Sequence, residues 1–331
     1  MSPNYSRDPP FPYVRSRCFT VHEHTPPYPP PPIPTKLTQR EKTERIRLSL
    51  LQRSILHPPQ GGSLGTSTVE FEISYALQAG EEHRSQVLAV NILKTSSDCL
   101  KKNVTRAVAK VYDPLYYDHT NCRDPFSATD LSYATEAAVY NRLADLQGTV
   151  IPAYYGSYSL ELPVDQSTTR TVRLILMEFI QGYSMQELEP AKFLQSERKR
   201  IMKLVIDGES AIYTRDICLM DKHPRNVMVV QSCDASQSVS RIVHIDFEKS
   251  SLSRMWKAPI CSYAAPNFLP GTFISPLLRW HESWDVQKNF QAWIDWDYQS
   301  WLEEEYAHTK SSITPEMRDV FLPAEDSDAS T

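Results

Sequence analysis

The order of hydrophobic and polar residues predicts a strand-rich region in the first half of the chain. Residues Thr68–Leu77 alternate apolar and polar side chains, and Gln86–Leu93 and Arg106–Tyr112 are short apolar runs rich in valine and alanine. Both patterns are typical of strands. We therefore expect three consecutive strands here, and the same pattern returns at Pro152–Leu160 and Arg170–Ile180.

Helical spacing marks two further segments. Asp130–Gln147 carries apolar residues three and four positions apart, with Asp130 as the expected N-cap and Gly148 as the expected stop. Ala191–Tyr213 is a longer helical stretch. The expected order is strand-strand-strand-helix-strand-strand followed by a mostly helical half, which is an α+β arrangement.

Composition sets both ends of the chain apart. Of the 25 prolines, 13 lie before residue 60, and the run from Pro26 to Pro32 lacks most of the backbone donors that helices and sheets need. We expect residues 1–65 to form a polyproline-like or disordered arm, either an inert tail or a ligand for an SH3/WW-type groove. The polar, acidic residues 311–331 are expected to form a second loose tail.

Charge and cysteine content narrow the class of protein. The chain has 35 basic and 40 acidic residues, a net charge of −5, and no basic cluster interleaved with aromatics. These features argue against a nucleic-acid binder and a polybasic membrane-surface protein. No apolar run is long enough to span a bilayer, and neither a secretory signal nor a C-x-x-C pair occurs. We expect an intracellular, cytoplasmic protein with reduced thiols, with the nucleus as an open alternative.

The residues with the most chemical content lie at two ends of short apolar runs. Asp221 and Asn226 precede the run at 227–230, and Asp246 follows the run at 242–245. Asp221 can accept the proton of a substrate hydroxyl, while Asn226 and Asp246 offer hard oxygen ligands to Mg²⁺. Phosphoryl transfer uses those three parts in that chain order.

The pattern D-x-x-x-x-N followed by I-D-F resembles the catalytic and metal-binding loops of the protein-kinase-like fold. The spelling D-x-H-P-x-N with D-F-E is similar to that of aminoglycoside phosphotransferases and choline kinases, and A-K-V-Y-D-P-L-Y-Y and Y-A-T-E-A-A-V-Y resemble a group of fungal kinase-like proteins. The resemblance covers about Val69 to Thr309. It implies a bilobal kinase-like α+β fold, with a five-stranded antiparallel sheet and one helix over residues 66–181, a hinge at 180–182, and a mainly helical lobe over 182–310.

The resemblance also implies ATP and Mg²⁺ and assigns roles to further residues. Lys110 would anchor the phosphates, and Glu136 would pair with it. Glu136 lies on the same helical face as the apolar residues, and an inward carboxylate needs a cation. Lys94 is an alternative phosphate lysine, less favoured because it leaves a strand before the helix unexplained. The implied roles are catalytic for Asp221, Lys110 and Glu136, metal-binding for Asn226 and Asp246, and nucleotide-binding for Lys110, Met177, Glu178 and Ile180.

Several positions depart from the family pattern. No glycine occurs between residues 81 and 147, so the turn after the first predicted strand lacks the glycines that let a backbone approach phosphates. Leu219 stands where the family often has histidine, and Asn267 replaces the acid of an A-P-E motif. We expect Mg-ATP-dependent transfer to a hydroxyl, on a small molecule rather than a protein. The alternative is a pseudokinase that serves as a nucleotide-binding or interaction module.

Other chemical readings carry less weight. A hydrolase or glycosidase that pairs Asp221 with Asp246 is disfavoured, because no G-x-S-x-G motif occurs and the sheet is not predicted to be parallel. His223 and His244 are expected to stabilise a turn and a strand, whereas Arg225 is expected to pair either with a phosphate or with a carboxylate in the activation region. Five tryptophans are expected to fill core: Trp280, Trp284, Trp293, Trp296 and Trp301.

Overall fold

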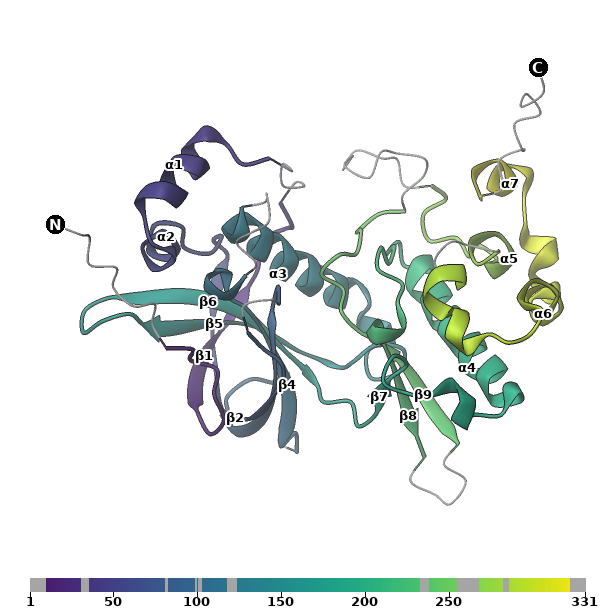
Figure 1. The fold of residues 1–331 in the computed structure, drawn as a ribbon, viewed down its shortest axis with the longest axis horizontal. Helices are drawn as coiled ribbons and strands as arrows, with labels where there is room; N and C mark the ends of the chain where they lie inside the picture. The colour runs from purple at the N-terminus through teal and green to yellow at the C-terminus, as the bar shows by residue number, and fades with distance from the viewer. Residues whose placement is uncertain are drawn as a thin grey trace. The chain divides into compact units, whose positions relative to one another are not determined.

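The computed structural model describes residues 10–30, 36–80, 83–98, 100, 103–117, 124–232, 238–254, 268–281 and 286–321. The chain divides into two compact units (Figure 1). The first unit contains Met1–Asn141 and Ala153–Phe179, and the second contains Arg142–Pro152 and Ile180–Thr331. In the parts of the chain that the structure describes, no helix has the length and apolar character needed to cross a membrane.

The first unit is built on a closed antiparallel sheet of six strands (Figure 1). The strands neighbour one another in the order β1, β2, β3, β4, β6, β5, and pairing of His22 with Ser159 joins β1 to β5 and closes the sheet. The strands are β1 (Cys18–Thr25), β2 (Ser63–Gln78), β3 (Gln86–Thr95), β4 (Arg106–Tyr112), β5 (Tyr154–Pro163) and β6 (Thr169–Glu178).

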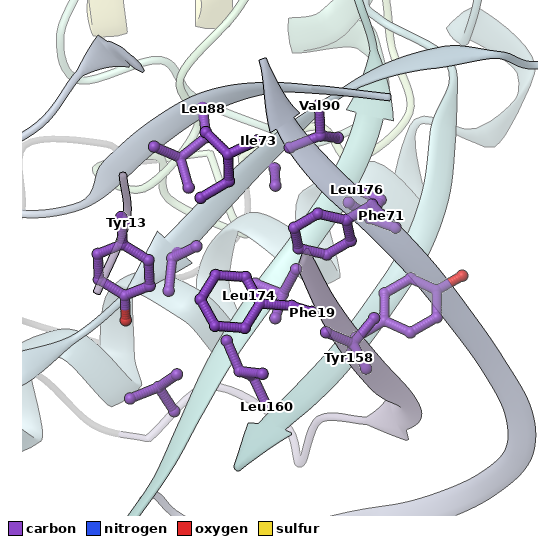
Figure 2. Close-up of a cluster of buried hydrophobic side chains, with 14 of the residues drawn as sticks. Tyr13, Phe19, Phe71, Ile73, Leu88, Val90, Tyr158, Leu160, Leu174 and Leu176 are labelled. Carbon is purple, nitrogen blue, oxygen red and sulfur yellow. The ribbon is translucent and has the colours of Figure 1, made fainter. Parts of the chain in front are cut away.

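The inner face of this sheet holds the first hydrophobic core (Figure 2). Alternate residues point inward, as the two-residue period of a strand requires, so that Phe19 of β1 contacts Phe71 of β2 with ring centroids 6.0 Å apart. Leu174 and Leu176 of β6 are fully buried in the same cluster. Each such side chain contributes about 1.5–3 kcal/mol by leaving water.

Strand β1 corrects the prediction of a disordered arm and of a five-stranded sheet. It lies inside residues 1–65, and its residues Phe19 and Val21 are buried while their neighbours are exposed. The helices α1 (Gln39–Arg47) and α2 (Leu50–Leu56) follow in the same segment, each with a capping box. The prolines lie outside β1, α1 and α2 and do not prevent these elements from forming. The last two residues of the proline run, Pro31 and Pro32, lie outside the described residues, and a groove-binding role for the run stays a prediction.

Helix α3 (Pro125–Arg142) begins five residues before the predicted start at Asp130. The carboxylate of Asp124 accepts hydrogen bonds from the backbone N–H and the hydroxyl of Ser127, both at 2.9 Å, and so caps the helix where proline is favoured as the first residue. Arg53 of α2 pairs with Asp124 at 3.4 Å, and its guanidinium lies 4.9 Å from the centre of the Phe126 ring. The N-terminal helices therefore hold the start of α3.

The second unit packs helices against a small antiparallel sheet in the order β7, β8, β9 (Figure 1). Its core includes the long helix α4 (Gln195–Thr214), which replaces the predicted helix Ala191–Tyr213. The remaining elements are β7 (Tyr183–Ser184), β8 (Val227–Gln231), β9 (Val239–His244), α5 (Pro276–Arg279), the π-helix η5 (Val286–Phe290), α6 (Tyr298–Glu305) and α7 (Pro315–Phe321), with 3₁₀ turns η2 (Ala144–Leu146), η3 (Pro190–Lys192), η4 (Pro224–Asn226), η6 (Gln291–Trp293) and η7 (Ala307–Ser312).

Two predictions about the second unit can be compared with these elements. Trp280, Trp293 and Trp301 are buried in its core, as expected, whereas Trp284 and the A-P-N residues 265–267 lie outside the described residues. The prediction of a loose tail over residues 311–331 is wrong for α7. Met317 of that helix is buried in a hydrophobic cluster. This burial holds α7 against the rest of the second unit, so this part of the chain is not a loose tail.

Candidate functional site

The first unit brings Lys110 and Glu136 together. Lys110 lies on β4 and Glu136 on α3, and the ammonium donates to the Glu136 carboxylate at 2.6 Å. Their side chains are only 6% and 0% exposed. The sequence-based expectation that an inward Glu136 needs a cation is therefore met by Lys110. Lys94, the alternative, is exposed on β3 opposite Glu70.

The alternation of β4 explains how Lys110 comes to face the helix. Ala109 and Val111 point into the closed sheet, so Lys110 and Tyr112 share the other face. The Tyr112 hydroxyl donates to the same Glu136 oxygen at 2.7 Å. Sequence analysis did not identify Tyr112, although its position two residues after Lys110 places it on the same face. We refer to Lys110, Tyr112 and Glu136 as the Lys110 cluster.

Met177 and Glu178 end strand β6 in the first unit. Met177 is buried, and its sulfur accepts a hydrogen bond from the Tyr140 hydroxyl at 3.3 Å. The backbone N–H of Glu178 donates to the Ala153 carbonyl at 2.8 Å, and its carboxylate accepts from the Ala153 N–H at 2.9 Å. Ile180 belongs to the second unit, where its carbonyl accepts from the Gly182 N–H at 3.1 Å.

The turn between β2 and β3 is closed by a side chain. The N–H of Gly80, a glycine with φ of +123°, donates to the Gln86 side-chain oxygen at 2.7 Å, and the Gln86 amide donates back to the Gly80 carbonyl at 3.1 Å. The Gly80 N–H is therefore already satisfied within the turn. The missing glycines noted in the sequence thus coincide with a turn that is held from within.

In the second unit the turn η4 fixes Asp221 relative to Asn226. The Asn226 side-chain N–H donates to the Asp221 backbone carbonyl at 2.9 Å, which directs the amide oxygen of Asn226 away from that carbonyl. The N–H of Ile245 donates to the Asn226 carbonyl at 2.9 Å and ties the end of β9 to the same turn. Both hard-oxygen residues proposed from the sequence are therefore held in one local framework.

Two cations hold the Asp221 carboxylate. Lys249 donates to Asp221 Oδ2 at 2.7 Å, and one guanidinium nitrogen of Arg225 donates to both carboxylate oxygens at 2.7 and 2.8 Å. Burial pulls the pKa of Asp221 upward, but the hydrogen bonds and charges of Lys249 and Arg225 outweigh it, so the pKa lies below its ordinary value. Asp221 is therefore a carboxylate at neutral pH. The carboxylate that Arg225 contacts is thus that of Asp221, four residues earlier, and not one in the activation region.

Asp246 follows β9 in an uncommon backbone conformation. Its φ is +64°, in the left-handed region that side-chain-bearing residues rarely adopt. Strain of this kind costs of order 1–3 kcal/mol and is concentrated at functional sites. Its carboxylate and the amide oxygen of Asn226 are the oxygen donors that Mg²⁺ prefers.

Asp221, Asn226, Asp246 and Lys249 line one pocket in the second unit. It is partly open to solvent, and its walls combine charged groups with the aromatic rings of Trp280 and Phe290. Buried Glu209 of α4 also lines it and accepts a hydrogen bond from the Trp280 indole N–H at 3.0 Å. Burial raises the pKa of Glu209, but the Arg279 and Lys222 charges and the hydrogen bonds lower it overall. We refer to Asp221, Arg225, Asn226, Asp246 and Lys249 as the Asp221 cluster.

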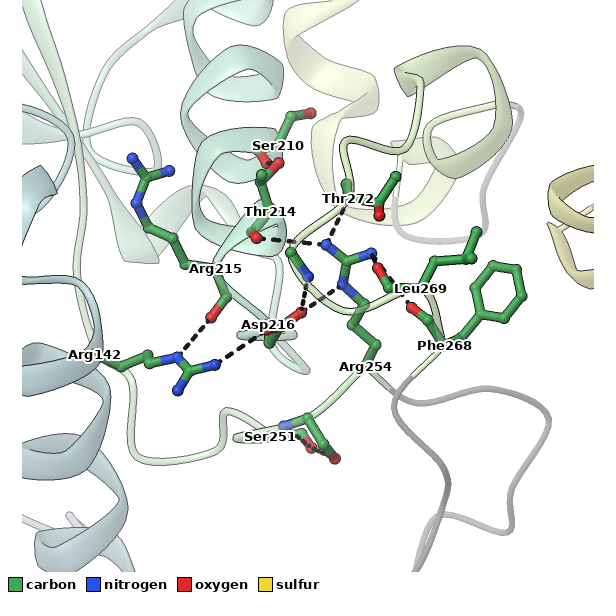
Figure 3. A network of polar contacts seen from close by, with 12 residues as sticks. Arg142, Ser210, Thr214, Arg215, Asp216, Ser251, Arg254, Phe268, Leu269 and Thr272 are labelled. Atoms are coloured by element: carbon green, nitrogen blue, oxygen red, sulfur yellow. Dashed lines mark hydrogen bonds and ion pairs between the residues drawn. The ribbon is translucent and has the colours of Figure 1, made fainter. Parts of the chain in front are cut away.

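A buried arginine anchors the chain beyond this cluster (Figure 3). Arg254 pairs with Asp216 at 2.9 Å, and its guanidinium donates to backbone carbonyls of Phe268, Leu269 and Thr272. Asp216, at the end of α4, also accepts from the Gly271 N–H at 2.9 Å. Contacts with Arg254 and Asp216 thus hold residues 268–272 in place.

The two histidines near the site have structural contacts. His223 Nδ1 accepts the Arg225 backbone N–H at 3.2 Å and helps to close η4. His244 is buried on β9, and a Cβ at Gly208 of α4 would lie 2.7 Å from its ring nitrogen. Burial lowers the pKa of His244 to about 4, so it is neutral at physiological pH.

Sequence reasoning missed Lys249, and the signal was modest. A lysine three residues after Asp246 predicts no contact by itself. In the folded loop, the hydrogen bond from the Ser250 N–H to the Phe247 carbonyl closes a turn that brings Lys249 back to Asp221.

Neither a scan against models of known protein families nor a search of curated proteins gives a match to this chain.

Proposed function

We propose that this chain is an ATP- and Mg²⁺-dependent phosphotransferase of the protein-kinase-like type, acting on the hydroxyl of a small molecule. The observation that carries the proposal is the Lys110–Glu136 pair, joined at 2.6 Å and almost wholly buried. Burying an ion pair costs several kcal/mol, so such a pair is weak evidence for a stabilising role. An ammonium held by a buried carboxylate suits the binding of nucleotide phosphates.

The order of strands supports the bilobal layout that the resemblance implies. Strands β2, β3, β4, β6 and β5 follow one another in the sheet, and α3 lies between β4 and β5 in the chain. In the proposed layout these five strands are the N-lobe sheet, β1 is an addition to it, and the second unit is the helical lobe. The proposal assigns the Lys110 cluster and the Asp221 cluster to one reaction.

Three residues of the Asp221 cluster have a defined task in the proposed reaction. Asp221 accepts a hydrogen bond from the acceptor hydroxyl and orients its oxygen. A carboxylate of low pKa is better suited to this orienting task than to strong general-base catalysis. Asn226 and Asp246 would hold Mg²⁺, which neutralises phosphate charge when bound. Lys110 anchors phosphates, and backbone groups of Glu178 and Ile180 bond the adenine with Met177 beside it.

The test is transfer of label from γ-labelled ATP into the low-molecular-weight fraction of a cell extract. We expect a labelled product with the wild-type chain and a loss of about 10²-fold or more in turnover for Asp221→Asn, with the Mg-ATP-induced rise in Tm retained. Asp295→Asn is the matched control, because Asp295 also pairs with an arginine but does not line the pocket. Label in generic proteins alone would overturn the small-molecule acceptor.

One observation favours the pseudokinase as a second candidate. The Gly80 N–H is bonded to Gln86, so this turn offers a phosphate fewer backbone donors than a glycine-rich turn does. A chain of this kind binds nucleotide weakly and acts as an interaction module. No rise in Tm at millimolar Mg-ATP, for wild type and for Gln86→Ala alike, would favour this candidate over the enzyme.

A further inference from the structure

Lys249 connects the two loops that carry the Asp221 cluster. It belongs to the segment after Asp246, yet its ammonium ends 2.7 Å from Asp221 Oδ2, on a residue 28 positions earlier in the chain. Backbone hydrogen bonds tie the same two loops on either side of this contact, at Asn226–Ile245 and at Cys218–Ser251. The Lys249 backbone is therefore fixed, and its head group is placed by the fold.

The turn that carries Lys249 is held by a buried residue, whereas the Lys249 ammonium is accessible. Phe247 is fully buried, and its carbonyl accepts the Ser250 N–H at 3.0 Å to close the turn that carries Lys249. The Lys249 side chain is 40% exposed and lines the pocket. An ammonium has three donors, so one can stay on Asp221 while the others bind a second anion.

Arg225 is less suited to the same task. A single guanidinium nitrogen of Arg225 already contacts both oxygens of Asp221, and its backbone is held in η4 next to Asn226. Its planar guanidinium keeps Asp221 in one orientation. The Lys249 ammonium is a compact charge on a flexible four-carbon chain, so it follows a moving phosphoryl group more readily than the Arg225 guanidinium does.

We propose that Lys249 is a catalytic cation that bridges Asp221 and the transferred phosphoryl group. This inference rests on the proposed phosphotransfer. The acceptor oxygen forms a bond to the γ-phosphorus while the bond from that phosphorus to the bridging oxygen breaks, and ADP leaves with the electron pair. The acceptor proton passes to Asp221. Lys249 keeps one N–H on Asp221 and donates the others to phosphoryl oxygens, whose charge it stabilises as the bonds exchange.

The role predicts a separation of binding from turnover. Label transfer from γ-labelled ATP into the low-molecular-weight extract is measured at saturating ATP, together with the apparent KM for ATP. For Lys249→Met we expect a loss of about 10²-fold in rate and a KM for ATP within roughly threefold of wild type. Lys249→Arg is expected to recover about tenfold, because the charge returns. Lys192→Met, at an exposed lysine outside the pocket, is the control.

A double-variant cycle separates catalysis from mere support of Asp221. If Lys249 only positions Asp221, Lys249→Met has no further effect in an Asp221→Asn chain. We expect instead a further loss of roughly tenfold in that background, since the phosphoryl contact remains to be lost. Full non-additivity, or an unchanged rate for Lys249→Met alone, would overturn the inference. Absence of transfer by the wild-type chain would overturn the proposed function itself.

Discussion

The Lys110 cluster and the Asp221 cluster each hold a carboxylate against cations, but in opposite surroundings. Lys110 and Glu136 are almost fully buried, whereas the side chains of Asp221, Lys249 and Arg225 are 21%, 40% and 44% exposed. A buried pair needs both partners, because removing one leaves a charge in a medium that solvates it poorly. An exposed pair contributes about 0–1 kcal/mol and exchanges partners easily. The first cluster is therefore coupled to folding, and the second is able to rearrange during a reaction.

The largest effect is expected from breaking the buried pair. Lys110→Met should lower the free energy of unfolding of the first unit by about 3–5 kcal/mol, because the Glu136 carboxylate loses its ammonium. Hydrogen exchange of peptides from β4 and α3, followed by mass spectrometry, measures this loss. The double variant Lys110→Met, Glu136→Gln is the control and should recover most of it, because the neutral amide carries no charge and still accepts from the Tyr112 hydroxyl. Wild-type protection in the single variant would contradict the comparison.

A half-buried carboxylate, that of Asp130, sharpens the comparison through pH. Burial raises the pKa of Asp130 to about 6, against the Gln60 N–H and the Arg173 charge that lower it. The folded chain thus binds this proton more tightly than the unfolded chain does, so the stability contributed at low pH is lost as the pH rises from about 4 to 6. Asp130→Asn should gain roughly 1–3 kcal/mol at pH 8 and little at pH 4.

Urea unfolding of the first unit at several pH values, followed by far-UV circular dichroism, measures the Asp130 effect. Asp165→Asn is the matched control. Hydrogen bonds from Ser167 lower the pKa of Asp165, so its contribution has the opposite sign and is lost as the pH falls. If the free energy of unfolding changed with pH in the same way for wild type and Asp130→Asn, ionisation of Asp130 would have no effect on stability.

Backbone strain at Asp246 offers a smaller effect. Glycine adopts a φ of +64° without the steric penalty of a Cβ. Asp246→Gly should therefore be more stable than Asp246→Ala by about 1 kcal/mol, while both lose the Mg-ATP-induced rise in Tm. Thermal unfolding with and without Mg-ATP provides both readouts. Equal stability of the two variants would show that the left-handed conformation is not strained.

The smallest effect is expected at the exposed cluster. Lys249→Met and Arg225→Gln should each change the free energy of unfolding by less than about 1 kcal/mol, because solvent replaces the lost contacts. Tryptophan fluorescence during urea unfolding reports on this change, since all the tryptophans of the chain belong to the second unit. A loss comparable to that of Lys110→Met would remove the distinction between the clusters.

Local patterns predicted the elements that carry the candidate site. The short apolar runs Gln86–Leu93 and Arg106–Tyr112 indicated β3 and β4, and the spacing of apolar residues placed Glu136 on the inward face of a helix. These features depend on neighbours in the sequence, so a period of two or of 3.6 is enough to find them.

Other features depend on contacts between distant residues and escaped prediction. Strand β1 has only eight residues and is stabilised by β2 and β5, so its local sequence among the prolines did not indicate a strand. Helix α3 begins at Pro125 because Asp124 both caps it and receives Arg53 from 71 residues away. The contact between Lys249 and Asp221 likewise follows from how two loops are tied together.

The closure of the sheet by β1 has a consequence for synthesis on the ribosome. β1 can pair with β2 early, but its partner on the other side, at Ser159, is made 137 residues after His22. At about 5–20 residues per second this interval lasts roughly 7–27 s. During that time the nascent chain carries an open strand edge, which invites pairing with other chains. Completion of the first unit therefore waits for translation of β5 and β6, and chaperone protection is needed most in that interval.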